Sequence, residues 1–212
     1  MILMQRIIFW LYCAMFFLVP LVMWPYTSEV FEFNKIVTVY IFTTLIVGAW
    51  AIRSIVENKI ILRRTILDIP LLVFITSQTI STLLSIDPSI SFFGYYSRFN
   101  GGLLSVFCYA LLYWAFVSNL NAKQTLSTIH YSLFSAVLVC IYGVLEHFGI
   151  DKNIWVQDVQ SRVFSTLGQP NWLAAYIVAL LPLTWTKKPI NYFLSILFFI
   201  TLLFTKSRSG LL

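Results

Sequence analysis

Seven long apolar segments, separated by short polar ones, limit what this chain can fold into. They cover residues 7–24, 36–53, 69–86, 102–120, 125–146, 170–186 and 190–206. Each is close to the roughly 20 apolar residues that an α-helix needs to cross a bilayer. The chain is 59% hydrophobic and only 10% charged, whereas soluble domains carry about 25% charged residues. The pattern predicts an all-α integral membrane protein with one polytopic transmembrane region over residues 1–212.

The first and the sixth segments are less regular than the others. The first follows Arg6, as in a signal peptide, but its apolar run ends in Trp24-Pro25-Tyr26 without the small residues of a cleavage site. We therefore expect an uncleaved first span. The sixth segment has a short uncharged run that contains Pro182, and proline removes a helical hydrogen bond. We expect this span to be tilted or kinked, or to begin deeper in the bilayer.

Basic residues indicate the orientation, because lysine and arginine collect on the cytoplasmic side of membrane proteins. With the N-terminus in the cytoplasm, eight of the 14 Lys and Arg residues lie inside and six lie outside. The cluster of Lys59, Arg63 and Arg64 is the strongest inner anchor. The outer polar segments are the longer ones, at about 26–35, 87–101 and 147–169. Any binding or catalytic site is therefore expected on the outer face.

Three arginines depart from this rule. Arg98, Arg162 and Arg208 lie in outer segments, each just before a helix that runs inward. Helix N-termini carry unpaired N–H groups and partial positive charge, and a guanidinium forms a fork that matches phosphate oxygens. Two or three such ends together predict a diphosphate site at the outer leaflet. Residues expected to shape it are Gly168, Asn171 and Gly210. The alternative is that these arginines only snorkel to lipid phosphates.

Other polar features allow both a structural and a functional interpretation. The third span has a hydroxyl-rich stretch between Thr76 and Thr82, which can line a hydrated cavity or bond to a neighbouring helix. Glu146 and His147 can transfer protons, but adjacent helical residues point about 100° apart, so a structural role is the alternative. The sequence has no metal-ligand cluster, phosphate-binding glycine loop or nucleic-acid motif. We expect no cofactor, no metal and no nucleic-acid partner.

Several segments together resemble a known family. The stretch from Arg162 to Tyr176 reads RVFSTLGQPNWLAAY and is followed by an LPL triplet at 181–183. It resembles the superfamily of O-antigen ligases and O-antigen polymerases. The stretches at 203–210 and 93–102 are similar to short segments of the same proteins. The order and spacing of these motifs carry the resemblance, which extends from about residue 68 onward.

This resemblance implies a bacterial inner-membrane glycosyltransferase with a helical bundle of the GT-C type. Such enzymes transfer a glycan from an undecaprenyl-diphosphate carrier to a glycan, lipid or protein acceptor on the outer face, without a nucleotide sugar or a metal. Arginines of that face bind the carrier diphosphate, and Arg162 and Arg208 match them best. The family's catalytic histidine lies in a large outer loop further along, which this chain does not contain.

The last residues, from Ser207 to Leu212, look like the beginning of an eighth span. We therefore expect an N-terminal fragment that binds the lipid-linked glycan donor but does not catalyse glycan transfer. Its expected partners are the lipid-linked glycan, its acceptor and membrane lipid, in the bacterial cytoplasmic membrane. Two alternatives are a transporter or flippase of an anionic lipid-linked glycan and a non-catalytic membrane scaffold.

Overall fold

The computed structural model describes residues 2–96, 98–186 and 189–211. Within these residues the prediction of an all-α fold is confirmed, with nine α-helices, three 3-10 helices and no strands. The elements are α1 (Ile2–Leu18), α2 (Glu32–Val56), α3 (Asp68–Leu83), α4 (Pro88–Phe93), η1 (Phe99–Gly101), α5 (Leu103–Asn119), α6 (Ala122–His147), η2 (Ser165–Leu167), α7 (Pro170–Leu180), η3 (Leu181–Thr184), α8 (Pro189–Thr205) and α9 (Arg208–Leu211).

Each of the seven apolar segments overlaps one of the longer helices, namely α1, α2, α3, α5, α6, α7 and α8. The first helix, α1, begins earlier than the predicted span 7–24 and ends at Leu18. Helix α2 has 25 residues and α6 has 26, and both are long and apolar enough to cross a membrane. The other five have 11 to 17 residues. In the part of the chain that the structure describes, length and composition therefore qualify two helices as spans, and seven crossings stay a prediction.

Proline determines both ends of the helical part of the sixth segment. Pro170 is the first residue of α7, where its missing N–H costs little. Helix α7 ends at Leu180, and Pro182 lies in the 3-10 helix η3 that follows. Because proline cannot donate to the helical ladder, the chain tightens here instead of continuing as an α-helix. Of the alternatives expected for this segment, which were a tilt, a kink or a deeper start, the structure shows a break in the helix at Pro182. Helix α7 is only about 17 Å long at 1.5 Å per residue.

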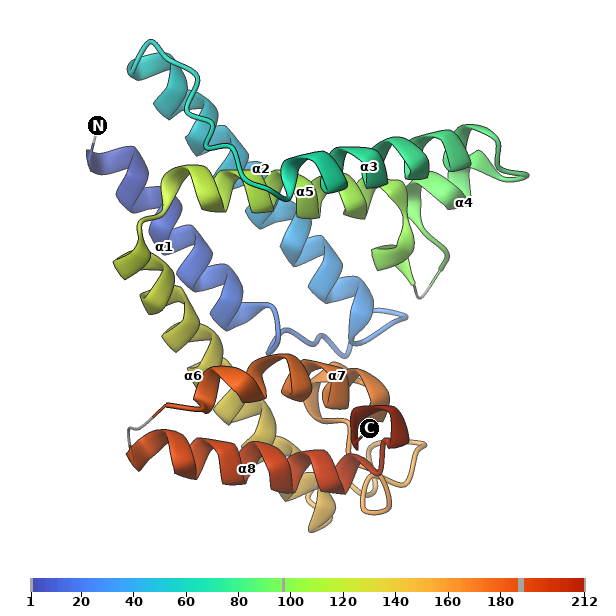
Figure 1. Cartoon of the computed structure of the whole chain (residues 1–212). Helices are drawn as coiled ribbons and strands as arrows, with labels where there is room; N and C mark the ends of the chain where they lie inside the picture. The colour runs from blue at the N-terminus through green and yellow to red at the C-terminus, as the bar shows by residue number, and fades with distance from the viewer. Residues whose placement is uncertain (1, 97, 187–188, 212) are drawn as a thin grey trace.

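The longer helices alternate in direction (Figure 1). Helices α1, α3, α6 and α8 run from left to right in this view, and α2, α5 and α7 run from right to left. Helix α1 packs against α2 and α6, α5 packs against α2 and α3, and α8 packs against α6 and α7. The ends that the sequence assigns to the outer face therefore lie on the right in Figure 1.

Two apolar clusters hold these helices together. The first lies between α1, α2 and α5 and includes the fully buried side chains of Ile8 and Ile46. The second lies between α6, α7 and α8 and includes Leu173 and Phe198. Val163, in the loop before α7, is buried in the second cluster. This loop, which carries Arg162, is therefore part of the packed core.

Large apolar side chains cover the outside of several helices. Helix α3 has no buried residue. On α8, Phe193, Ile196 and Phe199 are 50–63% exposed. Soluble monomers rarely expose apolar patches larger than a few hundred Å². The surfaces of α3 and α8 are therefore suited to an apolar environment.

The hydroxyl-rich stretch of α3 bonds to its own helix. Thr76, Thr79 and Thr82 each donate to the carbonyl four residues earlier, at 2.8–2.9 Å. This type of bond satisfies a hydroxyl without a partner from another helix. These hydroxyl groups therefore need neither water in a hydrated cavity nor a partner on a neighbouring helix to complete their hydrogen bonds.

A small ion-pair network lies at the end of α2, among the residues predicted to be cytoplasmic. Arg53 Nε donates to Glu57 Oε1 at 2.8 Å, and Lys59 Nζ lies 3.1 Å from Glu57 Oε2. The hydrogen bonds from Arg53 and then Lys59 lower the pKa of the Glu57 carboxyl. Arg53 also donates to Asn119 Oδ1 at 2.9 Å, which ties the end of α2 to the end of α5.

Candidate functional site

The loop at residues 161–169, which carries Arg162, is anchored to α6 by a buried carboxylate. Glu146 is fully buried, and its Oε2 accepts hydrogen bonds from the backbone N–H of Phe164 at 3.1 Å and of Ser165 at 2.7 Å. Ser165 has a φ of 52°, and its hydroxyl donates to the Val139 carbonyl at 2.6 Å. Because Glu146 supplies the acceptor for two buried backbone N–H groups, it ties this loop to α6.

Glu146 and His147 point to different partners. The His147 ring stacks on Phe204, with ring centroids 3.9 Å apart, and its Nδ1 lies 3.0 Å from the Gln160 carbonyl oxygen. Glu146 faces the loop backbone instead. These contacts support the structural interpretation of both side chains rather than an acid/base pair.

A second anchor of the same loop comes from α2 and from the segment that follows α1. The ammonium group of Lys35 donates to the carbonyls of Val22 at 2.5 Å and of Thr166 at 2.7 Å. The Thr166 hydroxyl donates to the Pro20 carbonyl at 2.7 Å. Sequence reasoning assigned no role to Lys35, because its partner Thr166 is 131 residues away. The loop before α7 is therefore held by α2, by α6 and by the segment after α1.

Gly168 shapes the loop by packing against an aromatic ring. Its φ is +78°, and a Cβ at this position would lie 2.4 Å from Cγ of Phe31. The Phe31 ring also contacts the rings of Trp155 and Phe164. The predicted shaping role of Gly168 thus has a specific cause, which is the close approach of the loop backbone to Phe31.

We expect Gly168→Ala to destabilise the fold by about 1–3 kcal/mol, the usual range for a strained backbone conformation. The substitution both strains the left-handed backbone and places a methyl group into Phe31. Gly48→Ala is the matched control, because a Cβ there meets nothing within 4 Å and alanine favours helix. Thermal unfolding of the purified variants in detergent measures the difference. Equal midpoints for the two variants would show that Gly168 is not constrained.

Arg162 lies on the surface, where the loop crosses the end of α8. Its Nε donates to the Thr205 carbonyl at 3.1 Å, and its Nη2 donates to Asn171 Oδ1 at 3.3 Å. A guanidinium has more N–H donors than these two bonds use. In the described part of the chain no carboxylate forms a salt bridge with it. Arg162 is therefore oriented by the protein while donors stay accessible to a ligand.

The C-terminal turn brings Arg208 into the same region. Ser207 is buried, and its hydroxyl donates to Asn171 Oδ1 at 2.9 Å. Arg208, which follows it, is exposed and begins α9. Gly210 allows this turn to approach α7, because a Cβ on it would lie 2.7 Å from Cβ of Ala174. We call the resulting group the arginine cluster, made of Arg162, Asn171, Ser207 and Arg208.

Arg98 lies in a different neighbourhood. It precedes η1 in the tight loop between α4 and α5, where its backbone N–H donates to the Tyr95 carbonyl at 2.7 Å. It is near enough to Glu32 for a Coulombic attraction between the two side chains. Among the described residues no hydrogen bond joins it to the arginine cluster. Two of the three predicted arginines are therefore brought together, and the third is associated with α2.

A small cavity lies among α2, α5, η1 and the start of α7. It has a volume of about 220 Å³, and polar groups from three elements line it: Glu32 and Lys35 of α2, Asn100 of η1 and Trp172 of α7. We call it the polar cavity. Trp172, in the first turn of α7, lines the polar cavity, whereas no residue of the arginine cluster does so among the described residues. Sequence reasoning missed Glu32, since a carboxylate at a predicted span end is usually solvated.

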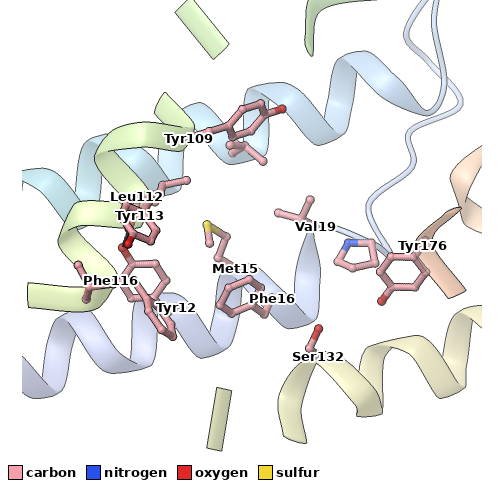
Figure 2. Close-up of a pocket in the computed structure, with 13 residues that line it drawn as sticks. Tyr12, Met15, Phe16, Val19, Tyr109, Leu112, Tyr113, Phe116, Ser132 and Tyr176 are labelled. Carbon is pink, nitrogen blue, oxygen red and sulfur yellow. Dashed lines mark hydrogen bonds between the residues drawn. The ribbon is translucent and has the colours of Figure 1, made fainter. Parts of the chain in front are cut away.

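A larger cavity of about 710 Å³ lies among α1, α5 and α6 (Figure 2), and we call it the apolar cavity. Figure 2 shows Phe16 and Phe116 in its wall, which is almost entirely apolar. Val19, Val39 and Tyr109 line both cavities. The two cavities are thus neighbours, an arrangement that suits a ligand with an apolar chain and a polar head.

The chemistry available at this site comes from guanidinium, amide, hydroxyl and carboxylate groups. In the ranges that the structure describes, no group of three or more His, Cys, Asp or Glu side chains is arranged to hold a metal ion. Comparisons with protein-family models, with curated proteins and with solved structures found no match.

Proposed function

We propose that this chain is an integral protein of the bacterial cytoplasmic membrane, with its N-terminus in the cytoplasm. Two observations support the proposal. Helices α3 and α8 expose large apolar side chains, and the longer helices alternate in direction, so that their ends gather on two opposite sides (Figure 1). In this orientation the arginine cluster, at the start of α7 and the end of α8, faces outward.

We infer that the arginine cluster binds the diphosphate of a lipid-linked glycan, of the undecaprenyl-diphosphate type. The observation that carries this inference is the geometry of Arg162. Its guanidinium is oriented by Thr205 and Asn171 at 3.1 and 3.3 Å, yet it has no carboxylate partner among the described residues. An arginine that only snorkels to the lipid surface needs no such fixed acceptors.

The neighbouring cavities support an amphiphilic ligand. The apolar cavity has the size of a small-molecule site and offers almost no polar surface. The polar cavity adjoins it and leads to the first turn of α7. An isoprenoid chain in the apolar cavity would direct its polar end toward the first turn of α7, the turn that carries Asn171 of the arginine cluster.

The chemistry of glycan transfer fits this assignment. When a glycan leaves a diphosphate carrier, the bond between the sugar carbon and the diphosphate oxygen breaks, and negative charge grows on the diphosphate. Preorganised donors that face this growing charge lower the barrier. In an O-antigen ligase-like glycosyltransferase, this chain would bind the donor and stabilise the departing diphosphate. The acceptor would be a glycan, a lipid or a protein.

The test is a titration of the purified chain in phosphatidylcholine nanodiscs with undecaprenyl diphosphate and with undecaprenol. We expect the diphosphate to bind at least about tenfold more tightly, since charge-assisted hydrogen bonds to phosphate contribute more than 1.4 kcal/mol, or about one factor of ten. Tryptophan fluorescence provides the readout. Equal affinities for the two lipids would reject diphosphate recognition and favour a scaffold role.

A further inference from the structure

A third cavity lies where α5 ends and α6 begins, at helix ends that the sequence assigns to the cytoplasmic face. It has a volume of about 710 Å³ and is lined by residues 63–66, by the end of α5 and by the first turn of α6. We call it the inner cavity. Arg63 and Arg64 both line it, and no carboxylate does so among the described residues. The inner cavity therefore presents positive charge.

The segment that carries these arginines runs between α2 and α3 and is fixed along α5 (Figure 1). The backbone N–H of Arg63 donates to the Ser118 hydroxyl at 3.0 Å. Two residues further along, the hydroxyl groups of Thr65 and Tyr113 lie 2.8 Å apart. Because both contacts are to α5, the fold determines where the backbone of the two arginines lies relative to the cavity.

The two carboxylates nearest in sequence are bound to other groups. Asp68 accepts from the backbone N–H and the hydroxyl of Thr65 at 2.9 and 2.8 Å, and Arg64 acts on it through its charge. Glu57 belongs to the ion-pair network at the end of α2. In the part of the chain that the structure describes, neither carboxylate forms a salt bridge with an arginine of the inner cavity. Both arginines are exposed, so their guanidiniums are accessible to an anion.

The rest of the wall indicates which anion fits. Phe116, Val117 and Leu120 line the cavity from α5, and the largely exposed side chains of Ile66 and Leu126 flank it. A phospholipid combines acyl chains for this apolar surface with a phosphate, whose oxygens match the guanidinium fork. Basic pockets between membrane helices on the cytoplasmic side bind anionic headgroups in this way. A zwitterionic headgroup would place its own cation beside the arginines, so the charge selects a headgroup with net negative charge.

We propose that the inner cavity binds an anionic phospholipid of the cytoplasmic leaflet, with Arg63 and Arg64 on the headgroup phosphate and an acyl chain against the end of α5. The proposal rests on the membrane location proposed above. It does not rest on the diphosphate site, because the arginine cluster lies at the start of α7 and the end of α8, on the opposite side of the bundle. The bound lipid would join the segment between α2 and α3 to the helix pair α5 and α6.

The experiment measures the binding of phosphatidylglycerol and phosphatidylcholine to the detergent-purified chain by native mass spectrometry. We expect the wild-type chain to prefer phosphatidylglycerol roughly 25-fold, because each basic residue near an anionic lipid contributes about a factor of five. Arg63→Ala and Arg64→Ala should each reduce the preference about fivefold, and the double variant should have none. A wild-type chain without the preference would overturn the proposal.

Lys59→Ala is the matched control. Lys59 is an exposed cation of the same loop, but it pairs with Glu57 and does not line the inner cavity, so its removal should leave the preference unchanged. A loss as large as in Arg63→Ala would indicate a general attraction to surface charge and overturn the site. Glycerol phosphate, which has the phosphate but no acyl chains, should bind much more weakly than phosphatidylglycerol. Equal binding would overturn the lipid assignment in favour of a site for free phosphate.

The double variant of Arg63 and Arg64 also separates this inference from the proposed function. It should keep the preference for undecaprenyl diphosphate over undecaprenol, because it leaves the arginine cluster intact. Loss of that preference would move diphosphate binding to the inner cavity and overturn the assignment of a separate lipid site. A chain that prefers phosphatidylglycerol but not undecaprenyl diphosphate would reject the diphosphate site and support this one. Thermal unfolding confirms that each variant is folded, and the single variants provide the answer if the double variant is not.

Discussion

Replacing Glu146 with alanine should lower the stability of the fold by about 3 kcal/mol or more, since a buried group left without its partner costs about 1–3 kcal/mol. The substitution leaves two backbone N–H groups, those of Phe164 and Ser165, without their acceptor in the core. It also opens space where a fully buried side chain lay. Thermal unfolding in detergent should show a midpoint roughly 10 °C lower.

Asp158→Ala is the matched control for this variant. The Asp158 carboxylate also accepts from two backbone N–H groups, those of Gln160 at 3.1 Å and Ser161 at 3.2 Å. It is exposed, so water replaces the lost acceptor and the midpoint should change little. Similar losses for the two variants would mean that burial of Glu146 does not determine how the loop is held.

Arg162→Ala should weaken the binding of undecaprenyl diphosphate roughly 100-fold, because it removes charge-assisted donors to the phosphate oxygens. The side chain is exposed and forms two hydrogen bonds at the ends of α7 and α8. Its loss should therefore affect affinity much more than stability. Equilibrium titration in nanodiscs measures the affinity, and thermal unfolding measures the stability.

Arg162→Lys and Lys152→Ala distinguish geometry from charge. Lysine keeps the positive charge but cannot form the planar fork, so Arg162→Lys should still lose roughly tenfold in affinity. Lys152 is an exposed cation in the same predicted outer segment, and its removal should leave the affinity unchanged. A fully active Arg162→Lys variant, or a loss of affinity in Lys152→Ala as large as in Arg162→Ala, would indicate a general electrostatic effect.

The helices were predictable because apolar runs of helical length are a strong local signal. The break after Leu180 was also predictable from a local signal, because Pro182 has no backbone N–H to donate to the helix. Helix α4 was missed, although its signal is local. The Asp87 carboxylate caps it by accepting from the Ile90 N–H at 3.1 Å, and Pro88 is its first residue. An N-cap aspartate followed by proline indicates a helix start.

The candidate site was predictable only where neighbours in sequence are neighbours in space. Arg162 and Asn171 are nine residues apart and belong to the same sequence motif, the stretch from Arg162 to Tyr176. The contacts of Arg162 with Thr205 and of Ser207 with Asn171 join residues 43 and 36 positions apart. Local patterns do not encode such contacts. Arg98 shared the same local pattern as the other two arginines, yet packing places it beside Glu32.

Buried and half-buried charged groups were the least predictable part of the site. Glu32, Lys35 and Glu146 are near the ends of apolar segments, where a charged side chain normally reaches water. Their burial depends on loops that fold over them from distant parts of the chain, as the bond from Lys35 to Thr166 shows. A charged residue at a span end therefore identifies a candidate, and only the tertiary structure distinguishes an anchor from a solvated group.

The central claim is that the arginine cluster recognises a lipid-linked diphosphate. The most direct measurement is the ratio of the affinities for undecaprenyl diphosphate and undecaprenol in the same nanodiscs, compared between the wild-type chain and Arg162→Ala. We predict a ratio of about 100 for the wild-type chain, the same factor as the loss expected for Arg162→Ala, and a ratio near one for the variant. A variant that stays folded and keeps the wild-type ratio would contradict the assignment of Arg162 to diphosphate binding.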